Sequence, residues 1–190
     1  MFRFAVLAGL ALAPALAAEP ILRPGSAAGH PAMDAELRGF FAIAPDGQGL
    51  PPGQGRAKQG AKIYAERCAP CHGAQLQGNP DTGGEPLIGG QGSLKSAAPL
   101  YTVESYWPYA TTLLDYIKRA MPFDSPGSLT DNEVYDLVAF ILSKARIIKP
   151  DQPVNSVTLP KISMPNRNGF VPDPRPEIPG RATAKAPRAQ

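Results

Sequence analysis

The segment that most constrains the fold is Cys68-Ala69-Pro70-Cys71-His72, which holds both cysteines of the chain and one of its two histidines. The spacing C-x-x-C-H is that of c-type haem attachment. In this chemistry the two thiols add across the haem vinyl groups and form thioethers. The imidazole of His72, fixed beside Cys71, then binds the iron on its proximal side. The segment therefore predicts one covalently attached haem c.

Three other interpretations of this segment are weaker. A structural zinc site needs four N or S ligands, and outside the segment the chain offers only His30, in a Gly/Pro-rich lead-in. A redox-active cysteine pair is expected near a β-α-β pattern, and the sequence shows none. A disulfide between residues so close together would constrain little of the unfolded chain. Haem attachment is favoured over all three.

The candidates for the second axial ligand are the remaining thioethers and the other imidazole, namely Met33, Met121, Met164 and His30. We predict Met121, which follows His72 by 49 residues. It stands at the end of an expected helix and before Pro122, so a stiff turn presents its side chain. Met164 is also followed by proline, but it lies in a tail without a periodic pattern.

A His/Met pair raises the reduction potential of haem iron and leaves no open position for a substrate. These properties favour electron transfer and predict no catalytic residue. We expect an apolar haem pocket from Leu87, Ile88, Leu113, Leu114 and Ile117. Three aromatic residues are candidates to bind the haem propionates, with ordinary core packing as the alternative: Tyr106, Trp107 and Tyr109.

The N-terminus has the pattern of a secretory signal peptide, with Arg3, an apolar stretch and an Ala-Leu-Ala motif that predicts cleavage after Ala17 or Ala18. A retained membrane anchor would need about 20 apolar residues, and this stretch is shorter and contains Pro14. Loss of Arg3 leaves 18 of the 19 basic residues against 16 acidic ones, a net charge of +2. That charge is too small to suggest nucleic-acid binding. We expect a periplasmic protein without stable membrane insertion.

The hydrophobic pattern predicts an all-α core. Expected helices cover residues 57–68, which deliver the cysteines, 111–120, and 130 to about 146, with a further short helix near 33–41. The last core helix begins at a capping box, Thr130 to Glu133, and its buried stripe comprises Val134, Leu137, Val138, Ile141 and Leu142. Gly60 and Tyr64 are expected to meet Tyr135 or Phe140 in a close helix crossing.

The rest of the chain is rich in Pro and Gly. Residues 73–109 are expected to form a long loop that packs against a haem edge. We divide the chain into a signal peptide (1–18), an N-terminal extension (19–55), a haem domain (56–148) and a Pro-rich tail (149–190) that wraps the core or a partner.

The order of a first helix, C-x-x-C-H, a Met-Pro segment and a capped last helix resembles class I c-type cytochromes over residues 57–146. Four segments resemble, in addition, the cytochrome subunit of Sox-type sulfur or sulfite dehydrogenases. They are PDGQGLPPG (45–53), SYWPYATT (105–112), RAMPF (119–123) and MPNRNGF (164–170).

This resemblance implies a class I cytochrome c fold, with roughly three to four helices around the haem and extended Pro-rich arms, and it implies iron ligation by His72 and Met121. It also implies that the chain accepts electrons from a molybdenum-cofactor dehydrogenase subunit and passes them to a downstream acceptor cytochrome. Well-known members carry two haem-binding motifs, whereas this chain has one. The alternatives are a freely diffusing cytochrome c, and a haem sensor or peroxidase with an open sixth site.

Overall fold

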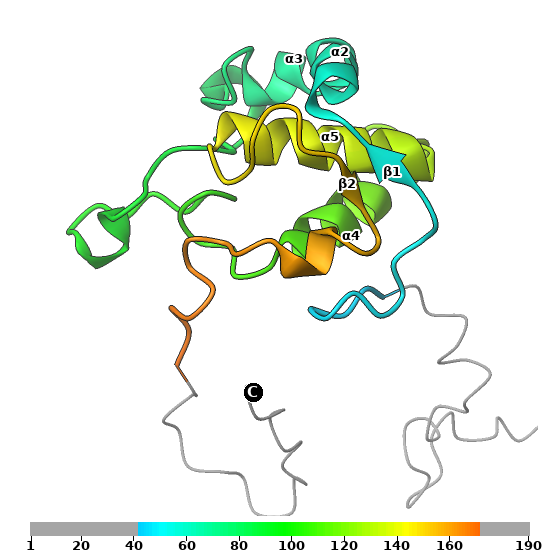
Figure 1. Ribbon diagram of the computed structural model, residues 1–190. Coiled ribbons are helices and arrows are strands. Elements are labelled where there is room, and N and C mark those ends of the chain that lie inside the picture. The colour runs from blue at the N-terminus through cyan, green and yellow to red at the C-terminus, as the bar shows by residue number, and fades with distance from the viewer. Residues whose placement is uncertain (1–41, 172–190) are drawn as a thin grey trace, which may run out of the picture. The chain divides into compact units, whose positions relative to one another are not determined.

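The computed structural model describes residues 42–171, and the regular secondary structure of these residues is mainly helical, as expected. The α-helices are α2 (Ala57–Arg67), α3 (Ala69–His72), α4 (Ala110–Ala120) and α5 (Asp131–Lys144). Short 3-10 turns are η1 (Pro80–Thr82), η2 (Ser93–Lys95) and η3 (Leu159–Lys161), and the strands are β1 (Gln54–Gly55) and β2 (Val154–Asn155). Figure 1 shows α5 between the α2–α3 pair and α4. The expected long loop carries only η1 and η2.

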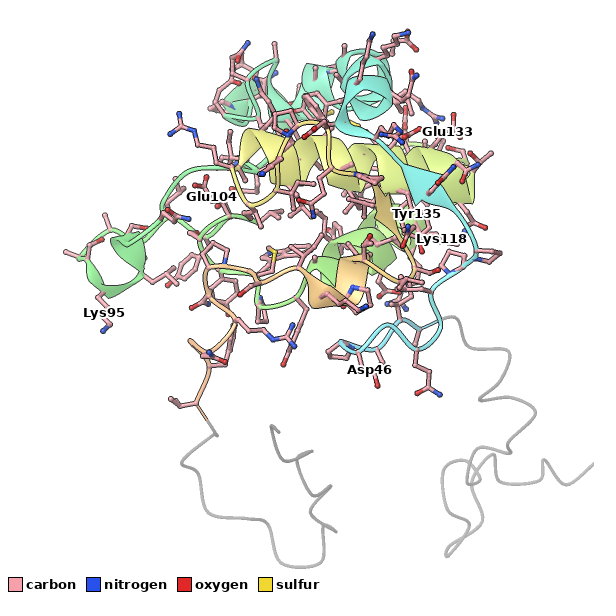
Figure 2. All side chains as sticks on the ribbon, in the orientation of Figure 1. Asp46, Lys95, Glu104, Lys118, Glu133 and Tyr135 are labelled. Atoms are coloured by element: carbon pink, nitrogen blue, oxygen red, sulfur yellow. The ribbon has the colours of Figure 1, made fainter. Side chains whose placement is uncertain are left out.

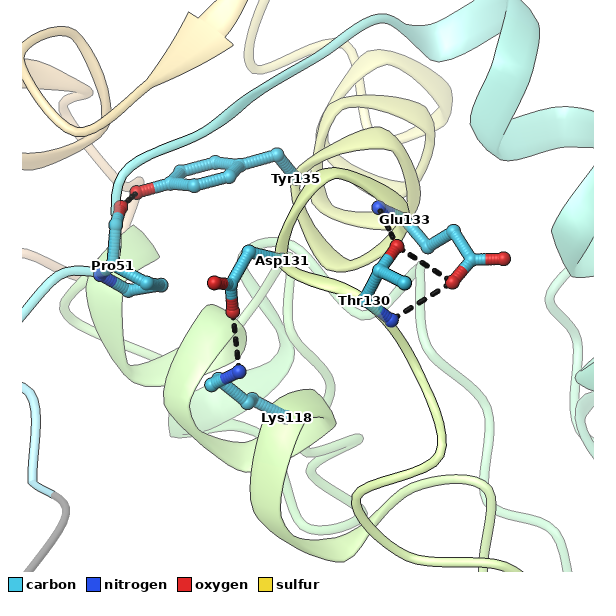
Figure 3. Close-up of polar contacts among 6 residues, drawn as sticks. All are labelled: Pro51, Lys118, Thr130, Asp131, Glu133 and Tyr135. Atoms are coloured by element: carbon cyan, nitrogen blue, oxygen red, sulfur yellow. Dashed lines mark hydrogen bonds and ion pairs between the residues drawn. The ribbon is translucent and has the colours of Figure 1, made fainter.

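Helix α5 begins at the predicted capping box. The Glu133 amide donates to the Thr130 hydroxyl at 3.4 Å, and the Glu133 carboxylate accepts from the Thr130 amide at 2.8 Å (Figure 3). These bonds satisfy amide groups that have no partner inside the helix. The predicted apolar stripe of α5 is buried along its whole length. It forms the centre of the core.

The end of α5 has the hydrogen bonds of a Schellman motif. The amide of Arg146 donates to Ser143 O at 3.0 Å, and that of Ile147 donates to Leu142 O at 2.9 Å. This turn requires a left-handed backbone at Arg146, whose φ is +58°. Glycine is the usual residue in this conformation, so arginine is an uncommon choice here.

The predicted close crossing joins α2 to α5. A Cβ atom on Gly60 would lie 1.9 Å from the Asp136 carbonyl oxygen, so only glycine permits this approach. One turn further along α2, the ring of Tyr64 packs on that of Phe140 with centroids 5.1 Å apart. Of the two contacts expected for Tyr64, the structure therefore shows the one with Phe140.

Helix α4 contributes Leu113, Leu114 and Ile117 to the same core. It ends at Met121, whose amide donates to Ile117 O at 3.1 Å. The following Pro122 has no amide to continue the helix. This places the methionine at the junction between a helix and a turn, as predicted.

The described parts of both arms, residues 42–55 and 149–171, contact the helical core. Strand β1 of the lead-in pairs antiparallel with β2 of the tail, and the Tyr135 hydroxyl of α5 donates to Pro51 O at 2.9 Å (Figure 3). The tail also buries several apolar side chains in the core, which the sequence did not suggest: Val154, Leu159, Ile162 and Met164. The tail therefore wraps the core over much of its described length.

The expected signal peptide, the helix near 33–41, His30 and Met33 lie outside the described residues. Within residues 42–171, no helix combines the length and the apolar character that crossing a membrane requires.

Candidate haem-attachment site

The C-x-x-C-H segment forms one compact helical turn. The amide of Cys71 donates to Cys68 O at 3.1 Å, and the amide of His72 donates to the same oxygen at 2.8 Å. Pro70 stands in the first turn of α3, where its missing amide proton is no loss. The turn therefore holds two thiols and an imidazole together. Cys68 is half-buried and Cys71 is exposed, and neither forms a disulfide.

The ring of His72 is oriented by a backbone carbonyl. Its Nδ1 atom lies 2.7 Å from Glu85 O. Because a carbonyl oxygen only accepts hydrogen bonds, Nδ1 must carry the proton and donate it. The lone pair of Nε2 is then available to a metal, in the arrangement typical of ligating histidines.

The loop after the turn holds its backbone from one side. The Gly78 amide donates to His72 O at 2.8 Å, and the Asn79 side-chain amide donates to Pro70 O at 3.0 Å. The carbonyl groups of Pro70 and His72, which lie in a short helical turn, thus each accept a hydrogen bond. These bonds restrict the movement of His72.

Two further loop residues contact Cys71 itself. The Thr82 hydroxyl donates to Cys71 O at 3.2 Å, and Gly84 packs so closely that a Cβ atom there would lie 1.9 Å from the same oxygen. Any side chain at Gly84 would displace the loop or the turn. The backbone beside the second thiol is therefore fixed by contacts from the same short loop.

Tyr64 of α2 anchors the other end of the turn. Its ring is only 2% exposed, and its hydroxyl donates to Gly73 O at 2.7 Å. Burial, with a smaller contribution from Cys68, raises the pKa of Tyr64 well above its usual value of 10. The hydroxyl therefore keeps its proton and remains a donor at neutral pH.

The thiol of Cys68 is also shifted by its surroundings. Burial raises its pKa to about 11, with Arg67 acting in the opposite direction and Cys71 adding to the increase. Before haem is attached, Cys68 is therefore a neutral thiol at neutral pH.

The two described methionines differ in environment. Met121 is half-buried and packs against the core, and Cys68, Leu87 and Ile88 are also partly buried against the core. Met164 is only 2% exposed and lies inside the core. Iron ligation by Met121 stays a prediction, and the burial of Met164 among protein side chains gives that methionine a structural role.

The three predicted propionate donors make contacts within the protein. Trp107 packs edge-on to Tyr116, with ring centroids 5.7 Å apart. Tyr106 packs against Tyr101 and Phe170, with centroids 5.0 and 5.2 Å away. Their role toward a propionate stays a prediction.

Residues of the tail hold this aromatic loop in place. The Asn166 side chain donates to Tyr106 O at 2.7 Å, and the Arg167 guanidinium lies 4.5 Å from the centroid of the Tyr109 ring. Reasoning from single residues did not identify these contacts. The tail was expected to wrap the core or a partner, and segment 164–170 was part of the resemblance, but neither observation identified these contacts.

The residues present fit haem c. Two unpaired thiols on one turn suit the two vinyl groups, and an imidazole with its Nε2 free suits the iron. Apolar side chains at the edge of the core suit the porphyrin face. The donor set is thus that of covalent haem attachment.

Comparison with known proteins gives the same result. Residues 57–145 match the family described as cytochrome c. A chain in the crystal structure of the sulfane dehydrogenase SoxCD from Paracoccus pantotrophus is 32% identical, with 85% of each chain covered and a TM-score of 0.69. The chain therefore belongs to the cytochrome c family. Within it, the chain is a class I c-type cytochrome of the Sox type, and its cofactor is covalently bound haem c.

Two curated relatives are thiosulfate dehydrogenases. That of Psychrobacter arcticus is 31% identical over 122 residues, which cover 59% of this chain and 34% of the relative. That of Stutzerimonas stutzeri is 33% identical over 118 residues, covering 54% and 35%. The chain thus spans about a third of the length of these relatives.

Proposed function

We propose that this chain is the electron-transfer haem subunit of a periplasmic dehydrogenase that oxidises a sulfur compound. The main support is the likeness to the SoxCD chain, because it covers 85% of both chains and therefore includes the arms as well as the helical domain. Relatives named thiosulfate dehydrogenase add a second link to sulfur oxidation. The predicted signal peptide supports export.

The site residues have distinct parts in this function. Haem c, when bound, supplies an iron centre that takes up and releases one electron. Cys68 and Cys71 hold the cofactor covalently, and Nε2 of His72 ligates the iron on one side. Met121 is the proposed ligand on the other. With His72 and Met121 as its two protein ligands, the iron would offer no position to a substrate, so this domain would carry electrons.

The hydrogen bonds around the turn suit this task. Gly78 and Asn79 fix the backbone on one side of His72, and Tyr64 fixes Gly73 on the other. A ligand held by a rigid surrounding shell keeps its orientation when the charge on the metal changes. Little protein rearrangement is then needed when an electron arrives or leaves.

The oxidation itself belongs to a partner in this proposal. That partner is a molybdenum-cofactor subunit that oxidises the sulfur compound and reduces the haem, and a downstream cytochrome accepts the electrons. The chain therefore acts between two redox proteins and needs no catalytic residue of its own.

Isolation of the haem-loaded protein from the periplasm of its host tests this function. Metal analysis of what elutes should show molybdenum, and adding sulfite or thiosulfate should reduce the haem. The variant with both Cys68→Ala and Cys71→Ala is the control, because it lacks covalent haem.

Two outcomes would contradict the proposal. A lone low-spin cytochrome that no sulfur compound reduces would indicate a freely diffusing carrier. A high-spin spectrum with carbon monoxide binding would indicate an open sixth site, as in a sensor or a peroxidase.

A further inference from the structure

A basic groove lies beside the helix crossing, between the first turn of α2 and the end of α5. We define it by its cationic side chains, Lys58, Lys144 and Arg146. Its apolar lining is Ala57, Ala61, Ile88 and Phe140. Among residues 42–171, no acidic residue lines this groove. The surface of the groove thus combines three cationic side chains with apolar side chains at its base.

The three cations have no acidic partner in the described part of the chain. Within residues 42–171, Lys118 forms an ion pair with Asp131 and Arg119 forms one with Asp115. Lys58, Lys144 and Arg146 are exposed and take part in neither. Their positive charge is therefore available to an acidic group that approaches the groove.

Arg146 gives a second reason to regard the groove as a binding surface. It occupies the left-handed position of the α5 C-terminal motif, with φ at +58°, where glycine is free of strain. Non-glycine residues in this conformation persist at a cost in stability and are concentrated at functional sites. An arginine at this position is therefore consistent with a binding role for its side chain.

The groove also adjoins the haem-attachment site. Gln75, which lines it, follows His72 by three residues, and Ile88 follows Glu85, the carbonyl partner of His72, by three. A protein bound here would contact the same loops that hold the proximal ligand.

We propose that the basic groove binds an acidic, partly apolar segment of a redox-partner protein. The inference rests on the proposed function, since it assigns to that function a place where the partner docks. Charge complementarity selects acidic side chains, and the apolar floor selects apolar residues between them. Such pairing accelerates association and fixes the orientation of the partner.

A titration of the haem-loaded full chain with a capped peptide of alternating glutamate and leucine tests the groove. The readouts are amide chemical shifts and the Kd. Shifts should concentrate at Lys58, Ala61 and Lys144, and the same peptide with glutamine in place of glutamate should not bind. Raising the salt concentration should weaken binding, because exposed charges are screened.

Matched charge reversals give the control. The double variant Lys58→Glu with Lys144→Glu should weaken binding by on the order of tenfold. The double variant Lys95→Glu with Lys161→Glu has the same net charge but changes η2 and η3, neither of which lines the groove (Figure 2 shows Lys95). It should bind the peptide nearly as well as the original chain.

In the peptide titration, three results would overturn the inference: shifts that map elsewhere, equal weakening in both double variants, or no binding of the acidic peptide. Haem reduction by sulfite or thiosulfate through the co-purified partner is measured separately. If the groove variant is reduced at the unchanged rate, the partner docks elsewhere, while the proposed function stands. If no sulfur compound reduces the original chain, the proposed function itself fails.

Discussion

Single side chains fix the haem-attachment turn mainly by binding its carbonyl oxygens. Asn79 and Thr82 donate to Pro70 and Cys71, and Tyr64 donates to Gly73. Because the accepting groups belong to the backbone, their position does not depend on the rotamer of a second side chain. The orientation of His72 follows from the path of the chain.

Removing the Tyr64 hydroxyl should destabilise the protein. Tyr64→Phe leaves the Gly73 carbonyl without its donor in a buried place, so we expect the free energy of unfolding to fall by about 1 to 3 kcal/mol. Denaturant unfolding of the haem-loaded chain measures this. Tyr101→Phe is the control, since Tyr101 is 58% exposed and should change stability very little. Equal effects of the two substitutions would contradict the assigned role.

The raised pKa of Tyr135 predicts that the folded protein loses stability at alkaline pH. Burial, and secondly the Asp131 carboxylate, raise its pKa from 10 to about 12 in the folded protein. The unfolded chain therefore loses this proton first, so the contribution of Tyr135 is complete below pH 10 and declines as the pH rises toward about 12. Unfolding followed between pH 9 and 12 should show a shallower decline in Tyr135→Phe, and an identical slope would refute the prediction.

Among the helices, the crossing of α2 and α5 depends on one glycine. Gly60→Ala would place a methyl group 1.9 Å from the Asp136 carbonyl oxygen, so the helices must separate. We expect a loss of roughly 1 to 3 kcal/mol, as for overpacked cores. Thermal unfolding measures it, with Gln59→Ala at an exposed position of the same helix as the control. Unchanged stability in Gly60→Ala would show that the crossing tolerates a side chain.

The end of α5 gives a prediction of the opposite sign. Arg146→Gly should relieve the left-handed strain and raise the free energy of unfolding by up to about 1 kcal/mol, while weakening peptide binding in the basic groove. Arg146→Ala removes the same charge but keeps the strain, so it should lose binding without gaining stability. Denaturant unfolding and the peptide titration compare the two variants. A loss of stability in Arg146→Gly would argue against this account of the turn.

At the level of the whole molecule, local patterns were the most predictable. The capping box and the apolar stripe of α5 depend on residues a few positions apart, and the structure confirms both. The close crossing at Gly60 was also expected, because a glycine has no side chain and lets two helices approach closely. The spacing of the C-x-x-C-H segment also predicts that the two thiols and the imidazole lie close together, and the structure places them on one helical turn.

Contacts between distant segments could not be predicted from single residues. The carbonyl partner of His72 is Glu85, whose position depends on the path of an irregular loop. Val154 and Leu159 enter the core from a Pro-rich tail without helical or strand periodicity, and β1 and β2 are too short to leave a pattern. We expected this tail to wrap the core or a partner, but no pattern identified the side chains that enter the core.

The central claim is that His72 and Met121 ligate the iron while Met164 serves the core. The visible spectrum of the haem-loaded full chain tests it most directly, through the charge-transfer band between a thioether sulfur and iron. Met121→Ala should lose this band and keep its haem covalently attached. Met164→Ala should keep the band and lose about 2 to 5 kcal/mol of stability, as expected for a buried methionine. A band that survives in Met121→Ala, or disappears in Met164→Ala, would contradict the account.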